Sequence, residues 1–472
     1  MKKAVIAAAA IFCAAAITLC GCNKVKVTNN YYEMTDEQFS TYMNKLEESG
    51  ASVESLAEIS SQRSVFSSVS ILTFIPFLME PYGGYNNSSY LEDMVYSGSG
   101  VIVDIDKDNG DAYILTNCHV VYDDTSGYYD SDLGCTESAF SPLATKIYLY
   151  LYGQDIEDVN YTIGYKQTTY GGYDYIEYDC TGDTNYRMTA SIVSVSVQYD
   201  LALLKVTGSS VIKNSNAIAA TFAEDDEVYA GQAAYAVGNP LGDGTTVTMG
   251  VVSQESLQTY LNVRSSVYAL YREIKTDAAV NGGNSGGGFY NAKGELIGII
   301  NSKLDDADVD NNAYALAGSY VKRLYRLMRD TASGTAVTAE SGMGLSRPYL
   351  KGAYSVDSEY SSYYGANVQY SIDTGYETSY TYAYMDEQGR ARIAETVSAT
   401  TSSYGLSSGD VITHLLITDG SGNTVEDLDI TRKFILDDAL LSYRDGYTVT
   451  LTYTRGGNES TKEVSCQWYN VI

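Results

Sequence analysis

The stretch Asn281-Gly282-Gly283-Asn284-Ser285-Gly286-Gly287-Gly288 places one serine inside a glycine-rich loop. A serine hydroxyl is a poor nucleophile at neutral pH, so it needs a neighbouring base that takes its proton. The chain has two histidines, and one of them, His119, follows the apolar run Ile114-Leu115-Thr116-Asn117-Cys118. An aspartate, Asp200, precedes a second apolar run, Leu201 to Val206. These residue types could supply a nucleophile, its base and the carboxylate that orients the base.

The glycines around Ser285 serve a second need of the same chemistry. They let the backbone turn tightly, so that the N–H groups of Gly283 and Ser285 can point at one spot. Such donors stabilise the oxyanion of a tetrahedral intermediate, and the loss of one raises the barrier by about 2.7–4 kcal/mol. Taken singly, each of the three segments has an ordinary structural interpretation, as a strand end or a turn. Their joint occurrence favours the catalytic interpretation.

Several motifs together resemble the trypsin-like serine proteases, and most closely the HtrA (DegP/DegS-like) type. The resemblance covers about residues 64–330. The matching stretches are Ser97-Gly98-Ser99-Gly100, Thr116-Asn117 before His119, Asp200-Leu201-Ala202, Gly238-Asn239-Pro240-Leu241-Gly242, and Thr276-Asp277-Ala278-Ala279 with Gly283-Asn284-Ser285-Gly286-Gly287. The order His–Asp–Ser is that of the trypsin-like arrangement. The resemblance implies a triad of His119, Asp200 and Ser285, an oxyanion hole of Gly283 and Ser285, and no cofactor or metal.

The resemblance also bears on substrate selection. In the trypsin-like fold the residue six before the nucleophile lies at the base of the primary pocket, and here it is Ala279, followed by Val280. No carboxylate stands there, so the resemblance implies a pocket for small or medium apolar side chains, with Ile300 on another wall. Asp277 lies nearby in the sequence and is expected to hydrogen-bond the loop.

Three features depart from the family pattern or compete with it. Gly282 and Gly288 stand where the family has prolines, which loosens the loop, and Tyr-rich insertions lengthen the His119–Asp200 separation. Gly283-Asn284-Ser285-Gly286-Gly287 also satisfies the G-x-S-x-G pattern of α/β-hydrolases. That fold needs a helix directly after the serine and a later catalytic histidine, whereas glycines follow here and the later histidine is His414. The esterase alternative is therefore disfavoured.

Residues 64–303 consist mostly of short β-branched or aromatic runs separated by glycine turns. This pattern is typical of an antiparallel barrel or sandwich, and one such run is Tyr113 to Val121. With the resemblance, it predicts a mostly β protein with a chymotrypsin-like double β-barrel over 65–330. Residues 122–145 and 154–187 are rich in Tyr, Asp and Gly and are interpreted as loop expansions.

A linker is predicted at 331–341, followed by a second β-rich unit at 342–472. Within it, Tyr404-Gly405-Leu406-Ser407-Ser408-Gly409-Asp410-Val411-Ile412 precedes a predicted helix from Arg432 to Ser442. This order resembles a bacterial PDZ domain, an α+β unit that binds C-terminal peptides by adding them to a sheet edge. The carboxylate-binding residues stay unassigned. His414 is interpreted as a packed core histidine.

The N-terminus has the features of a secretion signal. Lys2 and Lys3 precede an apolar run from Ala4 to Leu19, which is shorter than the roughly 20 residues a membrane-spanning helix needs. Leu19-Cys20-Gly21-Cys22 resembles the bacterial lipobox, which implies removal of residues 1–21 and lipidation of Cys22; an ordinary secretory peptide with a free Cys22 is the alternative. Residues 22–64 are predicted to form a spacer with a helix that starts in a capping box of Thr35 and Gln38.

Composition limits the partners. The formal net charge is −29, and this acidity argues against nucleic-acid binding. Export permits disulfides, and Cys135 with Cys180 is a plausible pair because both fall in the predicted insertions. Four mature cysteines after Cys22 allow three connectivities, which the sequence does not distinguish. They are Cys118, Cys135, Cys180 and Cys466.

Together these features predict a lipid-anchored, extracytoplasmic serine endopeptidase of HtrA type. The resemblance implies exported or misfolded proteins as substrates, C-terminal peptides as ligands of the PDZ-like unit, membrane attachment through the lipid anchor, and a homotrimer. A different hypothesis is a catalytically weak or inactive protease-like module that recruits peptides as a sensor or chaperone. The glycines at 282 and 288 motivate it.

Overall fold

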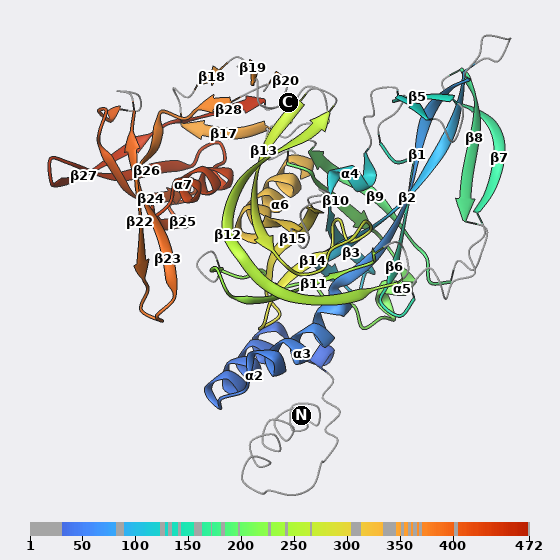
Figure 1. Cartoon of the computed structure of the whole chain (residues 1–472), viewed down its shortest axis with the longest axis horizontal. Coiled ribbons are helices and arrows are strands. Elements are labelled where there is room, and N and C mark those ends of the chain that lie inside the picture. The colour runs from blue at the N-terminus through green and yellow to red at the C-terminus, as the bar shows by residue number, and fades with distance from the viewer. Residues whose placement is uncertain are drawn as a thin grey trace, which may run out of the picture.

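The computed structural model contains two β-barrels, an N-terminal pair of helices and a C-terminal β-rich unit (Figure 1). The fold class predicted from the sequence is confirmed. The structure describes residues 31–81, 89–122, 128–130, 135–139, 143–154, 163–170, 172–180, 185–196, 199–224, 228–240, 244–264, 267–303, 313–333, 346–350, 354–356, 360–361, 366–367, 371–400 and 405–470.

The first barrel is closed by six strands paired in the order β1-β6-β9-β10-β3-β2, with β2 returning to β1. Its interior is filled by apolar side chains such as Ile71, Ile114, Leu149 and Leu204, all essentially inaccessible to solvent. These residues alternate with side chains on the opposite face of each strand, some of which, such as Leu115 and Leu203, are also fully buried, in a second core cluster. The strands are β1 (Ser68–Pro81), β2 (Tyr90–Asp106), β3 (Asp111–Thr116), β6 (Lys146–Leu151), β9 (Met188–Ser196) and β10 (Leu201–Val206).

The Tyr-rich insertions are not plain loops where the structure describes them, so the loop prediction is wrong there. Strands β4 (Tyr128–Asp130) and β5 (Cys135–Ala139) extend the sheet beyond β1, and the hairpin β7 (Ile163–Tyr170) and β8 (Tyr173–Cys180) pairs with β2. Tyrosine favours strands because its ring packs well on a pleated surface. In Figure 1 these strands lie together at the side of the first barrel away from the C-terminal unit.

A buried carboxylate fixes the β7–β8 hairpin to the barrel. Asp93 of β2 accepts the Tyr178 N–H (2.9 Å) and the Tyr175 hydroxyl (2.5 Å). Burial raises the pKa of Asp93, and the hydrogen bonds to the two tyrosine residues and the nearby Lys146 ammonium oppose that rise. The insertion is therefore held by specific polar contacts as well as by strand pairing.

The second barrel is a closed ring in the order β11-β12-β13-β16-β15-β14. Phe289, Ile299 and Leu316 lie fully buried at its centre. The helix α6 (Gly318–Ser333) follows directly and packs against β15 and β9. The strands are β11 (Ala233–Gly238), β12 (Thr246–Arg264), β13 (Val267–Thr276), β14 (Gly288–Asn291), β15 (Leu296–Lys303) and β16 (Ala313–Ala317).

The N-terminal helices α2 (Asp36–Glu48) and α3 (Val53–Ser64) rest on the second barrel (Figure 1). The predicted capping box is present, with Thr35 and Gln38 satisfying each other's backbone N–H groups. The 3-10 turns η1 (Tyr31–Glu33) and η2 (Val65–Ser67) flank the helices. Among the described residues, no helix is both long and apolar enough to cross a bilayer.

The C-terminal unit is a six-stranded sheet with one helix packed on it. The path β22-β23-β24-β26-β27 carries β25 beside β24, and β17 (Ser346–Leu350) pairs with β28 (Cys466–Asn470). Helix α7 (Lys433–Ala439) runs into η5 (Leu440–Ser442), where the sequence predicts a helix. The other elements are β22 (Tyr376–Met385), β23 (Ala391–Ala399), β24 (Val411–Thr418), β25 (Thr424–Asp429), β26 (Thr448–Arg455), β27 (Asn458–Val464), and the short pairs β18 (Tyr354–Val356) with β21 (Ser371–Asp373) and β19 (Tyr360–Ser361) with β20 (Ala366–Asn367).

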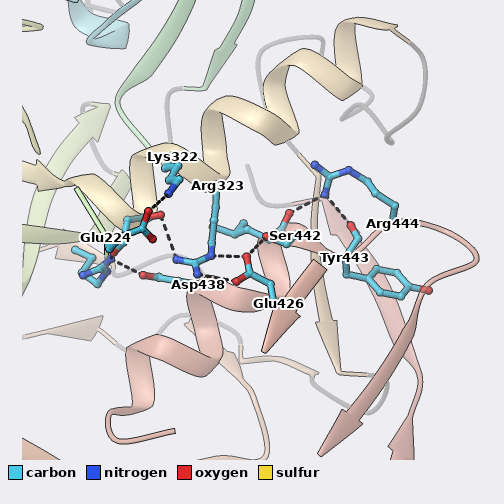
Figure 2. A network of polar contacts seen from close by, with 11 residues as sticks. Glu224, Lys322, Arg323, Glu426, Asp438, Ser442, Tyr443 and Arg444 are labelled. Atoms are coloured by element: carbon cyan, nitrogen blue, oxygen red, sulfur yellow. Dashed lines mark hydrogen bonds and ion pairs between the residues drawn. The ribbon is translucent and has the colours of Figure 1, made fainter. Parts of the chain in front are cut away.

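Buried ion pairs join α6 and β13 to the C-terminal unit, and Figure 2 shows the pair made by Arg323. Arg323 contacts both carboxylate oxygens of Glu426 at 2.9 Å, and both side chains are more than nine-tenths buried. Arg272 of β13 binds Asp438 of α7 at 2.5 Å. Such pairs are costly to break from one side because the remaining charge stays buried. The two parts are therefore in specific contact.

Two expectations for single residues are corrected. Cys180 is a free, buried thiol, so the Cys135–Cys180 disulfide is not present. The backbone carbonyl of Cys180 accepts a hydrogen bond from the Arg187 guanidinium at 3.0 Å. His414 is partly exposed and hydrogen-bonds Asp427 at 2.7 Å, so it is not a packed core histidine. The alternation of β24 places His414 on the face of the sheet opposite Leu415 and Ile417, and there it contacts Asp427 of β25.

A pH dependence of stability is expected at Asp410. Two hydrogen bonds from Arg455 and one from the Ser407 N–H hold the pKa of Asp410 below its ordinary value of about 3.9. A lowered folded-state pKa stabilises the fold above that range, and the contribution is lost as the pH falls through the folded pKa. Urea denaturation should therefore show that Asp410→Asn is destabilising at pH 7 and that its difference from wild type shrinks toward pH 3. A difference that grows on acidification would contradict this assignment.

Candidate active site

His119 and Asp200 are in direct contact. The His119 ring Nδ1 lies 2.8 Å from Asp200 Oδ2, and the His119 backbone N–H donates to Oδ1 at 3.0 Å. Because a carboxylate only accepts hydrogen bonds, the ring carries its proton on Nδ1, so Nε2 is the ring nitrogen with acceptor character. The ring is about half exposed, with 48% of its side-chain area accessible, whereas the Asp200 carboxylate is largely buried, at 11%. This is the arrangement of an oriented base.

The local backbone explains how these two residues meet. The predicted strand Tyr113 to Val121 ends at Thr116, and Cys118–Val121 forms the short helix α4, so His119 lies on a turn of helix rather than on a strand. The Asn117 amide donates to the Asp200 carbonyl at 3.0 Å, which connects the turn before α4 to the start of β10. Asp200 has φ of +45°, the one positive value among non-glycine residues that the structure describes. Such strain is held in place by surrounding contacts and is typical of functional sites.

The Ser285 loop packs against the end of β3, close to the chain that carries His119. A Cβ at Gly286 would lie 2.2 Å from the Thr116 hydroxyl and 2.1 Å from the Ser99 carbonyl, so only glycine fits. The Gly286 N–H donates to the Ile300 carbonyl at 2.8 Å. The Ser285 hydroxyl donates to the Asn301 carbonyl at 3.3 Å, a long hydrogen bond. Rotation about the Cα–Cβ bond can re-aim this hydroxyl between staggered positions.

The N–H groups of Gly283 and Ser285 have no hydrogen-bond acceptor within the described part of the chain. Gly283 has φ of +92° and Gly286 has φ of +84°, values that L side chains rarely adopt. The turn itself is closed by the Asn284 N–H donating to the Asn281 carbonyl. Backbone N–H groups without an acceptor, at Gly283 and at Ser285 itself, are the kind of donor that a developing oxyanion requires.

The residues predicted to form the primary pocket have different environments. Ala279 is exposed, and its carbonyl accepts the Thr248 hydroxyl at 2.8 Å. Val280 is partly buried against the second-barrel core, whereas Ile300 is completely buried within it. Asp277 accepts the Val251 N–H at 2.7 Å, so it hydrogen-bonds the neighbouring strand β12. The position expected at the base of the pocket therefore carries an alanine and not a carboxylate.

Two residues that the sequence analysis did not identify, Asn301 and Glu273, connect the nucleophile to the barrel. The buried Asn301 amide donates to the fully buried Glu273 carboxylate at 2.7 Å. Asn301 lies where the β15–β16 register shifts between Ile300 and Ser302, which turns its carbonyl toward Ser285. Neither residue has a sequence signal, because the pairing depends on a bulge and on strands far apart in the chain.

Substitution of Gly286 by alanine should abolish activity and destabilise the fold. The added Cβ would meet backbone and hydroxyl oxygens at 2.1–2.2 Å in a left-handed conformation. Gly282→Ala is the matched control, since its Cβ would have open space and its φ is not positive. Thermal unfolding and peptide hydrolysis should show a clear loss for the first variant and near wild-type values for the second. Equal behaviour of the two would contradict the packing of the loop on β2 and β3.

Comparison with known proteins agrees with this geometry. Residues 98–299 match the family described as trypsin-like peptidase domain. The chain is 28% identical over 434 residues to the serine protease Do-like HtrA of Lactococcus lactis subsp. lactis, covering 89% of this chain and 80% of the relative. It is 37% identical over 139 residues to the periplasmic serine endoprotease DegP of Salmonella typhimurium, covering 29% and 27%.

Among solved structures, the HtrA-type protease AlgW with a decapeptide aligns over 88% of this chain and 98% of its own, at 18% identity and a TM-score of 0.42. The peptidase match includes all three of His119, Asp200 and Ser285. The Lactococcus relative extends the likeness through the C-terminal unit. The family match and the Do-like relatives identify residues 98–299 as a trypsin-like serine protease domain of the HtrA (Do-like) type.

Proposed function

We propose that this protein is an endopeptidase in which Ser285 is the nucleophile, His119 the base and Asp200 the residue that orients the base. The observation that carries the proposal is the double contact of Asp200 with the His119 ring and backbone, at 2.8 and 3.0 Å. This contact presents a neutral Nε2 as a proton acceptor. The closely packed Ser285 loop supplies the hydroxyl.

The chemistry follows in two steps. The Ser285 hydroxyl turns from Asn301 toward His119, loses its proton to Nε2 and attacks the peptide carbonyl, while the N–H groups of Gly283 and Ser285 receive the oxyanion. The imidazolium then gives its proton to the leaving amine, and the acyl-enzyme remains. Water then gives a proton to Nε2 and attacks the acyl carbonyl; the ester bond breaks, the imidazolium returns the proton to the Ser285 oxygen, and the acid is released. This chemistry requires no cofactor or metal ion.

The C-terminal unit is proposed to bind C-terminal peptides. In the described residues, β17 pairs with β28 alone, which leaves its other edge for an added strand. Leu350, at the end of β17, packs in one core with Leu436 and Leu440 of α7 and η5. The edge and the helix therefore lie together, as strand addition beside a helix requires.

We further propose that the protein is extracytoplasmic and held to the membrane by a lipid on Cys22, with exported or misfolded proteins as substrates and a homotrimer as its assembly. The lipobox-like Leu19-Cys20-Gly21-Cys22 supports the anchor, although it lies outside the described residues. The periplasmic name of the Salmonella relative supports the location. Incorporation of labelled palmitate into wild type but not Cys22→Ala tests the anchor, and light scattering tests the trimer.

Degradation of unfolded β-casein tests the function. Wild type should cleave it, and Ser285→Ala should not. A folded wild-type protein that binds casein without cleaving it would instead favour the sensor or chaperone alternative, which the glycines at 282 and 288 motivate. Cleavage predominantly after Lys or Arg would contradict the apolar pocket proposed around Ala279, Val280 and Ile300.

A further inference from the structure

Ser99 of β2 takes part in four hydrogen bonds and is completely buried. It lies far from Ser285 in the sequence. Its N–H donates to the Ser285 carbonyl at 2.9 Å, and its hydroxyl donates to the Gly283 carbonyl at 2.7 Å. The hydroxyl also accepts the Asn239 N–H at 2.7 Å, and the Ser99 carbonyl accepts the Thr116 hydroxyl at 2.7 Å. Both residues of the proposed oxyanion pair are thus tied to Ser99 through their own carbonyls.

The Ser285 loop needs such outside contacts. Four of the seven residues from 281 to 287 are glycines, and glycine gives the backbone more conformational freedom than any other residue. A free peptide plane could rotate and turn its N–H away from the substrate. Fixing the carbonyl of a residue fixes its ψ angle, so the contacts at Gly283 and Ser285 restrict the planes next to both donors. Contacts from β2 therefore restrict the conformation of the Ser285 loop.

The contacts at position 99 require a side chain with a hydroxyl group. A Cβ at Gly98 would lie 2.7 Å from Val120 Cγ1, and a Cβ at Gly100 would lie 2.7 Å from Ile114 Cγ2. The strand thus presses closely on β3 and α4 on that side, while Ser99 faces the loop. A serine hydroxyl can donate and accept at once, which both the Gly283 carbonyl and the Asn239 N–H require. Alanine would leave both of these buried groups without that partner.

We propose that Ser99 is the positioning residue that holds the oxyanion donors Gly283 and Ser285 in their working orientation. This role rests on the proposed function of Ser285. Preorganised donors act where charge develops, so they lower the barrier of the chemical step more than they strengthen substrate binding. Loss of the Ser99 hydroxyl therefore lowers kcat and leaves KM nearly unchanged. If Ser99 had only a structural role, its loss would lower the stability of the fold without lowering kcat selectively over KM.

The test compares Ser99→Ala with wild type in peptide hydrolysis and in the rate of labelling by a fluorophosphonate, whose phosphoryl oxygen uses the same donors. We expect kcat and the labelling rate to fall about 10²-fold, the effect of losing one oxyanion donor, with KM changed less than about two-fold. Ser99→Thr retains the hydroxyl and should recover most of the rate. Ser67→Ala is the control, since this buried serine hydrogen-bonds the Tyr290 hydroxyl and the Ser64 carbonyl, neither of which belongs to residues 281–287, and it should keep wild-type kcat.

The outcomes separate the two levels of the proposal. A folded wild-type protein that takes no label overturns the proposed function and this role with it. A labelled wild type whose Ser99→Ala variant reacts equally fast overturns the role of Ser99 alone. If Ser99→Ala does not fold, Thr116→Val provides the same test, because it removes the hydrogen bond to the Ser99 carbonyl in an isosteric way. Its kcat should fall about five-fold, as for one ordinary hydrogen bond, and an unchanged kcat overturns the role.

Discussion

Replacement of Asp200 by asparagine will lower kcat about 10⁴-fold, while the free energy of unfolding and KM change little. Asp200 accepts both the His119 backbone N–H and the ring Nδ1–H. In the asparagine variant, the amide oxygen would take the backbone N–H and the NH₂ group would face the ring. The ring would then carry its proton on Nε2 and could not accept the Ser285 proton. Steady-state peptide hydrolysis measures the effect.

The chain offers a matched control for that variant. Asp427 hydrogen-bonds the other histidine, His414, at 2.7 Å in the C-terminal unit. Asp427→Asn makes the same chemical change at the second His–Asp contact and should leave kcat at the wild-type value. Comparable losses in the two variants would mean that Asp200 acts through general stability rather than through the His119 tautomer.

Replacement of Arg323 by methionine should destabilise the contact between the protease part and the C-terminal unit by about 3–5 kcal/mol. The guanidinium binds both Glu426 oxygens, and Glu426 also accepts the Ser442 hydroxyl at 2.5 Å in a buried setting (Figure 2). The variant leaves the Glu426 carboxylate buried without its counter-charge. Urea denaturation followed by Trp468, the single tryptophan, reports on the C-terminal unit directly.

Two further variants make this prediction specific. Arg323→Met combined with Glu426→Leu removes both charges and should recover most of the lost stability, because an apolar pair tolerates burial. Arg329→Met, on the same helix, breaks the exposed pair with Asp104 and should cost at most about 1 kcal/mol. If Arg323→Met and Arg329→Met were equally mild, the interface would not rest on the buried pair.

The two-barrel fold and the catalytic candidates could be predicted because their signals are local. His119, Asp200 and Ser285 each lie in a short stretch with recognisable flanks, and the structure brings His119 and Asp200 together. The helix at Arg432 to Ser442 likewise has a local apolar pattern that the structure confirms as α7 and η5.

The supporting residues could not be predicted because their roles depend on long-range register. Ser99 meets Gly283 across 184 positions, and Asn301 meets Glu273 through a bulge. The short helix α4 replaces the end of a predicted strand because contacts from Asn117 to Asp200 end the strand early. The partial exposure of His414 depends on the face on which it lies, and the β24–β26 register shifts between Ile412 and His414. No local sequence pattern predicts these long-range contacts.

The most direct test of the central claim is to map a fluorophosphonate adduct by peptide mass spectrometry. A phosphonylated serine forms only where a hydroxyl, a base and oxyanion donors converge. The account predicts one adduct, on Ser285, formed by wild type and lost in His119→Ala, whose Ser285 hydroxyl is still present. A folded wild-type protein that carries the adduct on another residue, or on Ser285 at an equal rate without His119, would contradict it.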